Sequence, residues 1–239
     1  AVRRGASPLS SDGMRLTMNG GLGADRLLGG SGDDQVSGGD GADVALMGDG
    51  ADVFVWNPGD DNDLVEGQAG YDALTFNGAN VSEYIAVTAI GERVRLTRDV
   101  ASVVMDFAGV ERVDVNALGG SDTIATGDLG GTDVTEVNAN LAVFGTGDLQ
   151  PDSVVVQGSA GDDVAVVAGD AGGIAVVGLA AQVNVTGSDG YGDGLTLNLL
   201  AGDDVADASG LQAGAIRFTA SGGDGADVLI GSAGDDVLL

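Results

Sequence analysis

The chain contains no cysteine, histidine or lysine, and all nine of its basic residues are arginines. It therefore lacks the commonest general bases of enzymes, as well as their thiol and amine nucleophiles. The motifs of serine hydrolases, zinc proteases and phosphate-binding loops are absent too. Paired aspartates such as Asp33 and Asp34 resemble the acid and base of a glycosidase. We interpret them as ion ligands or turn residues, and expect this chain not to be an enzyme.

Aromatic residues make up only 4% of the chain, and 9 basic residues stand against 37 acidic ones. So few aromatics predict a narrow core of valine, leucine, isoleucine and alanine. The net charge of -28 argues against nucleic acid as a partner, because the phosphate backbone would repel it. No apolar run reaches membrane-spanning length and no signal peptide opens the sequence, so we expect no membrane insertion. Without disulfides, an extracellular protein needs another stabilising element, for which calcium would serve.

Glycine is abundant, with 44 residues, and much of it lies in a regular pattern with aspartate. Residues 20–55 are four consecutive nine-residue units, GGLGADRLL, GGSGDDQVS, GGDGADVAL and MGDGADVFV. They fit the template G-G-x-G-x-D-x-U-x, in which U is a large apolar residue. Glycine accepts positive φ and lets carbonyls crowd together, while each aspartate supplies a hard anionic oxygen. Stacked units would place these carboxylates in a column, which an oxygen-seeking cation such as Ca²⁺ would make tolerable.

The pattern resembles the RTX family of calcium-binding nonapeptide repeats found in secreted bacterial proteins. Two less regular units follow at 58–66 and 67–75, where proline, aspartate and glutamine replace glycines, and two regular units lie at 222–239. The resemblance implies that six residues of each unit form a turn that binds several Ca²⁺ ions between coils, and that three form a strand. The ligands it implies are the side chains of Asp25, Asp34, Asp43, Asp52, Asp63, Asp72, Asp227 and Asp236, together with the backbone of Gly21, Gly23, Gly30, Gly32, Gly39 and Gly41.

Between the repeat blocks a slower rhythm replaces the nonapeptide. Gly-x-Asp recurs at 120–122, 161–163 and 202–204, and short apolar strands recur about every 20 residues, which is typical of a parallel β-solenoid. A β-sandwich is the alternative, but it does not require a constant phase. Residues 84–97 break the rhythm and predict a β-hairpin. The expected divisions are an N-terminal β-roll (1–75), an irregular β-hairpin insertion (76–112), a wider β-solenoid with coils of about 20 residues (113–221) and a second nonapeptide block (222–239).

One longer repeat is present as well. Residues 6–37 align without gaps to residues 208–239, and five of the identities lie outside the nonapeptides. A solenoid that ends without a polar cap leaves strand edges and a half-built core exposed. We therefore expect either an excerpt of a tandem array or self-association end to end.

These features predict an all-β fold, a right-handed parallel β-solenoid in which a β-roll continues into a wider stack. The function we favour is a calcium-binding structural segment of an extracellular bacterial assembly, such as a surface layer, fibre or long adhesin, that folds on binding calcium. The alternative is a calcium-binding C-terminal secretion or folding module of a secreted protease or lipase. A face that binds ice or glycan is a third hypothesis, but no regular outward threonine or aromatic ladder supports it.

Overall fold

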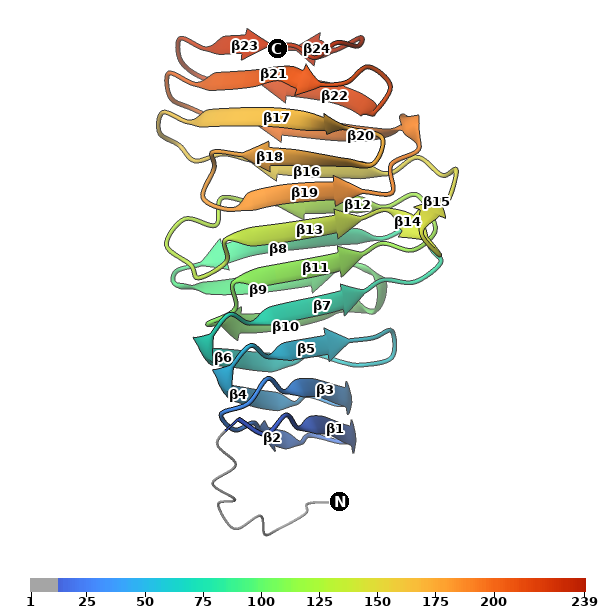
Figure 1. Cartoon of the computed structure of the whole chain (residues 1–239), viewed down its shortest axis with the longest axis vertical. Coiled ribbons are helices and arrows are strands. Elements are labelled where there is room, and N and C mark those ends of the chain that lie inside the picture. Colours follow the sequence, from blue (N-terminus) through green and yellow to red (C-terminus); the bar gives the residue numbers. More distant parts are fainter. Residues whose placement is uncertain (1–12) are drawn as a thin grey trace.

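The computed structural model describes residues 13–239 as a stack of coils built from two long β-sheets that face each other (Figure 1). Each coil runs along one sheet, turns at the edge and returns along the other sheet. The chain climbs from an N-terminal coil at one end to a C-terminal coil at the other. This is the predicted all-β solenoid. Residues 6–12, the start of the longer internal repeat, lie outside the described residues.

Each sheet contains eleven strands, and neither sheet follows a simple sequence order. In spatial order the first sheet, sheet A, consists of β1 (Thr17–Leu22), β3 (Gln35–Asp40), β5 (Val53–Trp56), β7 (Ala73–Asn77), β11 (Arg112–Asn116), β13 (Glu136–Asn140), β19 (Gln182–Thr186), β18 (Gly173–Val177), β17 (Val164–Asp170), β21 (Val205–Leu211) and β23 (Val228–Ile230). Sheet B consists of β2 (Arg26–Leu28), β4 (Val44–Gly50), β6 (Leu64–Gly70), β10 (Val103–Ala108), β9 (Arg93–Arg98), β8 (Tyr84–Ile90), β12 (Thr123–Thr126), β16 (Ser153–Gln157), β20 (Gly190–Asn198), β22 (Ile216–Ser221) and β24 (Val237–Leu238).

Two minor elements lie outside these sheets. The pair β14 (Ala142–Val143) and β15 (Thr146–Gly147) forms a small hairpin at the edge of the stack. A single 3-10 turn covers Val100–Ser102. Among residues 13–239 no helix is long and apolar enough to cross a membrane.

The core is a narrow layer between the sheets, built by period-2 alternation along each strand. Inward residues stack in register from coil to coil, so that Phe54 of β5 pairs with Leu74 of β7, which pairs with Val113 of β11. All three side chains are fully buried. Among the few aromatics, Trp56 and Phe76 stack with ring centroids 4.2 Å apart. Because the strands are in register, an inward side chain packs against the inward side chains of the coils before and after it. This packing favours coils of similar shape.

Two antiparallel meanders interrupt the parallel stack, one in each sheet. The predicted hairpin is present as β8 and β9, but β10 joins it, and all three lie within sheet B between β6 and β12. In sheet A, β17, β18 and β19 form an equivalent meander between β13 and β21. Here the structure differs from the parallel coils expected through 113–221. Each meander adds two strands to one sheet, so the pair keeps both sheets at eleven strands.

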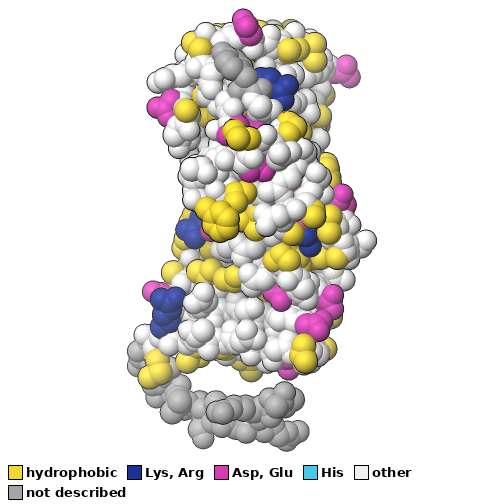
Figure 2. Space-filling model, turned by 90° about the vertical axis from the view of Figure 1, so that its right-hand side faces the viewer, with side chains coloured by type: hydrophobic (Ala, Val, Ile, Leu, Met, Phe, Trp, Pro, Cys, Tyr) yellow, Lys and Arg dark blue, Asp and Glu magenta, His cyan; other side chains and the backbone are white. Residues whose placement is uncertain are grey.

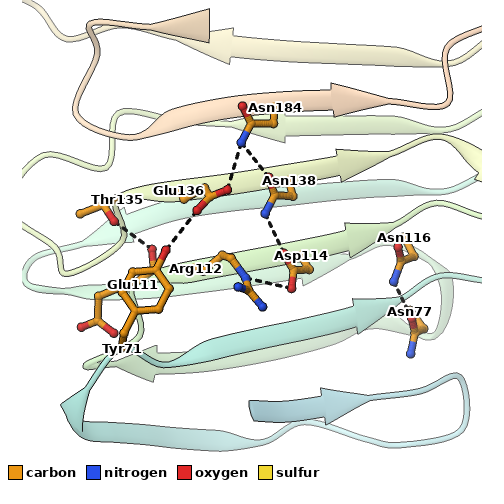
Figure 3. A network of polar contacts seen from close by, with 10 residues as sticks. All are labelled: Tyr71, Asn77, Glu111, Arg112, Asp114, Asn116, Thr135, Glu136, Asn138 and Asn184. Carbon is orange, nitrogen blue, oxygen red and sulfur yellow. Dashed lines mark hydrogen bonds and ion pairs between the residues drawn. The ribbon is translucent and has the colours of Figure 1, made fainter. Parts of the chain in front are cut away.

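Polar ladders cover the middle of the outer face of sheet A (Figure 3). Asn116 donates to Asn77 at 2.8 Å, and Asn140 donates to Asn116 at 3.0 Å. A parallel row leads from Asn184 to Asn138 and on to Asp114, each hydrogen bond 2.8 Å long. Side-chain amides carry both a donor and an acceptor, so a column of them can satisfy itself between stacked strands. These ladders tie neighbouring coils together on the solvent side.

Candidate metal centre

All eight predicted aspartates lie at the two edges of the solenoid, each directly before a strand. The carboxylates that precede sheet A strands form one column, the A column, and those that precede or enter sheet B strands form a second, the B column. The A column consists of Asp34, Asp52, Asp72, Glu111, Asp163, Asp204 and Asp227. The B column consists of Asp25, Asp43, Asp63, Glu83, Asp122, Asp152, Asp193 and Asp236.

In most column residues, one carboxylate oxygen accepts a backbone amide from the coil before it. The amide of Asp34 donates to Oδ1 of Asp52 at 2.6 Å, and the amide of Asp52 donates to Oδ1 of Asp72 at 2.8 Å. In the B column the amide of Asp25 donates to Oδ1 of Asp43 at 2.6 Å, and the amide of Asp43 donates to Oδ1 of Asp63 at 3.0 Å. These hydrogen bonds fix the carboxylates in a row of like charge.

The second oxygen, Oδ2, is buried without a hydrogen-bond partner in seven of the fifteen column residues. This holds for Asp25, Asp43, Asp52, Asp63, Asp72, Asp122 and Asp204. A buried carboxylate oxygen without a partner is costly, because the water it has lost is not replaced. An external cation would satisfy it.

Burial changes the acidity of the column residues. Loss of solvent, reinforced by neighbouring aspartates, raises the pKa of Asp63 to about 7 and that of Asp72 to about 6, against the lowering effect of a backbone hydrogen bond. The pKa of Asp152 rises to about 7 from the same leading cause. The pKa values of Asp43 and Asp52 are also raised by burial. In the absence of a cation, the folded state therefore favours protonation of these five aspartates.

In six of the eight nonapeptide turns, all except those of Asp52 and Asp63, glycine at the first position leaves the space into which Oδ2 points. A Cβ placed on Gly38 would lie 2.5 Å from Oδ2 of Asp43 and 3.1 Å from Oδ2 of Asp63. A Cβ on Gly20 would collide with the carbonyl oxygen of Gly38 and lie 3.2 Å from Oδ2 of Asp25. Carboxylate and carbonyl oxygens thus converge on a space that a side chain would fill. Such a set of hard oxygens suits Ca²⁺ and lacks the nitrogen and sulfur ligands typical of zinc.

Most of the turns fall into two classes, which we call open and closed. The turn of Asp63 fits neither, because only its second residue, Gly59, has positive φ and its Oδ2 has no partner. In an open turn the second and fourth of the six residues that end on the column aspartate both have positive φ, as at Gly39 (88°) and Gly41 (133°). Gly21 and Gly23 share this geometry, with φ of 96° each. Gln68 adopts φ of 78° in the same place, so the lost glycine of that unit does not change the turn. Where these aspartates are buried, Oδ2 has no partner.

In a closed turn the backbone itself occupies the second oxygen. The amide of Gly30 donates to Oδ2 of Asp34 at 2.8 Å, and the amide of Ser232 donates to Oδ2 of Asp236 at 2.6 Å. Neither Gly30 nor Gly32 has positive φ. Two predicted ligand residues, Asp34 and Asp236, thus lie in the columns but use Oδ2 for the backbone.

An arginine replaces the external cation at one level of the B column. Arg98 and Glu83 form a buried ion pair, in which Nε donates to Oε1 at 2.8 Å and one terminal nitrogen contacts the same oxygen. The guanidinium also lies 5.5 Å from the ring centroid of Trp56. The turn at Glu83 is closed, since the amide of Ala79 donates to Oε2 at 3.1 Å. This level is neutralised from within the chain.

About half of the column residues lie outside the nonapeptide pattern and were not predicted from the sequence. Glu83, Glu111 and Asp152 follow no glycine pattern, but Asp122, Asp163 and Asp204 end the three Gly-x-Asp tripeptides of the slower rhythm. That tripeptide also ends most nonapeptide turns, so it was the available signal. Within residues 13–239 no group of three or more His, Cys, Asp or Glu side chains is arranged to hold a metal. A cation in these turns would therefore depend on backbone oxygens.

Comparison with known proteins gives one finding. A family model for the RTX calcium-binding nonapeptide repeat matches residues 19–54 and 219–239, in four copies. A search of curated proteins found no match. RTX repeats bind calcium, and proteins that carry them are typically secreted by bacteria. Residues 19–54 and 219–239 of this chain are RTX calcium-binding nonapeptide repeats.

Proposed function

We propose that the chain is a calcium-dependent structural segment of an extracellular bacterial assembly, such as a surface layer, fibre or long adhesin, and that it has no catalytic role of its own. Several Ca²⁺ ions bind in the open turns, among them those of Asp25, Asp43, Asp52 and Asp72. The observation that carries this proposal is that Oδ2 of seven column aspartates is buried and has no hydrogen-bond partner. No feature of the described residues specifically favours the module of a secreted enzyme.

The columns give a physical reason for folding to depend on calcium. Stacked coils lie about 4.8 Å apart, where two like charges repel by about 1 kcal/mol in water and about 3.5 kcal/mol at an effective dielectric constant near 20. Domains are stable by only about 5 to 15 kcal/mol. Repulsion along two columns therefore competes with the entire stability of the fold. Bound calcium removes this repulsion and fills the turns.

We also propose that the ends of the solenoid accept a further coil, either of the same polypeptide or of a second copy. At one end Met18 is only partly buried, although it is in register with the fully buried Val36, and at the other end Leu238 is 41% exposed, although it is in register with the fully buried Ala220. The sequence similarity between residues 6–37 and 208–239 means that the two ends present related units. Stacking would cover these apolar side chains and continue both sheets.

Isothermal titration calorimetry of the full chain with calcium tests the binding proposal, and light scattering in the same buffers tests stacking. We expect more than one ion per chain, with heat from coupled folding, and particles that grow in calcium and dissociate on chelation. Absence of calcium binding would overturn the whole proposal. Calcium binding by strictly monomeric particles would overturn non-covalent stacking alone.

A further inference from the structure

Two open turns lie outside the nonapeptide repeats, at 117–122 and 199–204. In the first, Leu118 has φ of 67° and Gly120 has φ of 132°; in the second, Leu200 has φ of 76° and Gly202 has φ of 140°. These are the φ values of the repeat turns, with leucine at the second position where the repeat has glycine. The first position holds Ala117 and Leu199, as it holds Met47 in the repeat turn of Asp52. Left-handed backbone costs a residue with a side chain about 1 to 2 kcal/mol. The turns keep the open geometry in spite of this cost.

Each of the two turns ends on a fully enclosed aspartate with one unused oxygen. Asp122 is 2% exposed and Asp204 is 0% exposed. Oδ1 of Asp122 accepts the amide of Glu83 at 2.8 Å, and Oδ1 of Asp204 accepts the amide of Asp163 at 2.8 Å. Oδ2 of both residues is buried and has no partner. The hydrogen-bonding arrangement is therefore the same as at Asp43 and Asp52.

The neighbouring column positions show that this arrangement is not a general property of the solenoid. One coil before Asp204, Oδ2 of Asp163 accepts the amide of Ser159 at 2.8 Å in a closed turn. One coil before Asp122, Glu83 is paired with Arg98. These neighbours satisfy themselves with groups of the chain. Asp122 and Asp204 do not, although nothing in the fold prevents a closed turn at the adjacent level.

Backbone oxygens lie close to both turns. A Cβ on Gly78 would lie 2.8 Å from the carbonyl oxygen of Ala117, which is the first residue of the Asp122 turn. A Cβ on Gly223 would collide with the carbonyl oxygen of Leu200. The carboxylate of Asp148 adds a further charge beside the first turn, where its Oδ2 accepts the amide of Gly120 at 3.0 Å. Carboxylate and carbonyl oxygens with no nitrogen or sulfur ligand again favour a hard cation.

We propose that Asp122 and Asp204 each bind a Ca²⁺ ion, so that the calcium columns extend through the middle of the solenoid beyond the RTX repeats. This rests on the proposed function, because it assumes that the open turns of the repeats bind calcium. The ion at Asp122 neutralises the B column one coil beyond the Arg98 level, and the ion at Asp204 neutralises the A column beside the sheet A meander. Calcium then stabilises the wider part of the stack as well as its repeat-bearing ends.

Calcium counting on the full chain tests this proposal. The number of bound ions is measured by native mass spectrometry and equilibrium dialysis for the wild type and for Asp122→Asn and Asp204→Asn, which keep the Oδ1 acceptor. Each substitution should remove one ion or weaken one site at least tenfold. Asp203→Asn is the charge-matched control, since Asp203 is exposed and adjacent to Asp204; it should leave the count unchanged.

The outcomes separate the two proposals. If the wild type binds no calcium, the proposed function fails. If the wild type binds calcium and both variants keep the full count, the extension fails while the proposed function stands. An equal loss in Asp203→Asn would show that general charge governs binding, and would overturn the assignment too. Should the variants not fold, anomalous diffraction from wild-type crystals grown in calcium decides: density beside Asp43 but not beside Asp122 or Asp204 contradicts the proposal.

Discussion

In the open turns whose aspartate is buried, such as that of Asp43, the two carboxylate oxygens serve different purposes. Oδ1 accepts a backbone amide from the preceding coil, and so fixes the position of the turn whether or not a cation is present. Oδ2 faces the space beside the first turn residue and is the oxygen that a cation would contact. An amide in place of the acid would keep the first contact and lose the charge of the second.

Asp43→Asn should therefore weaken calcium binding without removing the coil contact to Asp25. We expect the calcium midpoint of folding to rise about tenfold, equivalent to about 1.4 kcal/mol. Asp114→Asn is the control, because Asp114 lies on the outer face of sheet A beside Arg112 and outside both columns. The measurement is a calcium titration followed by circular dichroism. Equal shifts in the two variants would contradict specific coordination at Asp43.

Among the arginines of residues 13–239, Arg98 is the one whose charge the fold encloses. Its side chain is 4% exposed and that of Glu83 is 0% exposed, whereas the side chain of Arg93 is 33% exposed. Removing one partner of a buried ion pair leaves an uncompensated charge and typically costs about 3 to 5 kcal/mol. Exposed pairs contribute only about 0 to 1 kcal/mol. The two arginines therefore permit a matched comparison within one meander.

Arg98→Met should lower the free energy of unfolding in calcium by about 3 to 5 kcal/mol, and Arg93→Met by about 1 kcal/mol or less. Urea denaturation followed by Trp56 fluorescence measures both, since Trp56 is buried and lies next to Arg98. Similar losses in the two variants would show that Arg98 does not act as an internal cation. Recovery of stability in Glu83→Gln/Arg98→Met would support the charge explanation.

At the level of elements, the repeat turns and the hairpin of β8 and β9 could be predicted from the sequence, whereas the addition of β10 to that hairpin and the whole sheet A meander could not. The nonapeptide spacing placed every predicted aspartate at a column position, because glycine and aspartate both have direct roles in the turn. The open turns at Leu118 and Leu200 escaped prediction, since leucine rarely adopts positive φ. The antiparallel placement of β17 to β19 escaped as well, because inward and outward alternation is the same for parallel and antiparallel strands.

Whether a turn is open or closed could likewise not be predicted from the sequence. The unit at Asp34 carries every glycine of the template, yet its turn is closed, and the unit at Asp72 lacks one glycine, yet its turn is open. Backbone conformation in these turns depends on the neighbouring coils as well as on local residue types. The column positions of the repeats could therefore be predicted from the sequence. Only the structure distinguishes aspartates with an unpartnered Oδ2 from those whose Oδ2 accepts a backbone amide.

The buried column aspartates predict that acidification stabilises the calcium-free fold and weakens calcium-dependent folding. Burial raises the folded pKa of Asp63 and Asp152 to about 7, above the ordinary aspartate value of 3.8. Without calcium, the folded form binds more protons than the unfolded form between about pH 4 and pH 7. Its stability is therefore greatest at the acidic end of this window and falls as pH rises through about 7.

With calcium, the same aspartates must be ionised, so the calcium midpoint of folding should rise as pH falls from 7.5 to 5.5. Circular dichroism in chelator and in calcium across this range measures both trends. We expect strand content in chelator to increase on acidification, and calcium affinity to decrease over the same interval. A chelated protein that is least stable at pH 5.5 would contradict the raised pKa values.

At the scale of the whole molecule, many of the negatively charged side chains are buried at the edges of the stack. The net charge is -28, yet in Figure 2, which looks onto the edge that carries the B column, acidic side chains are few and scattered. Many of the remaining carboxylates lie inside the turns, where Asp43, Asp63, Asp122 and Asp152 are each less than 5% exposed. Without a bound cation, this arrangement combines desolvation with repulsion.

The most direct test of this account is the far-ultraviolet circular dichroism of the full chain at pH 7.5, first after exhaustive chelation and then on titration with calcium. We expect the chelated chain to be largely disordered, and the strand signal to develop cooperatively as calcium approaches about 1 mM, within the range of extracellular calcium modules. Burial of Trp56 should follow the same midpoint. Unchanged strand content after complete removal of calcium would contradict the central claim that the ion columns hold the solenoid together.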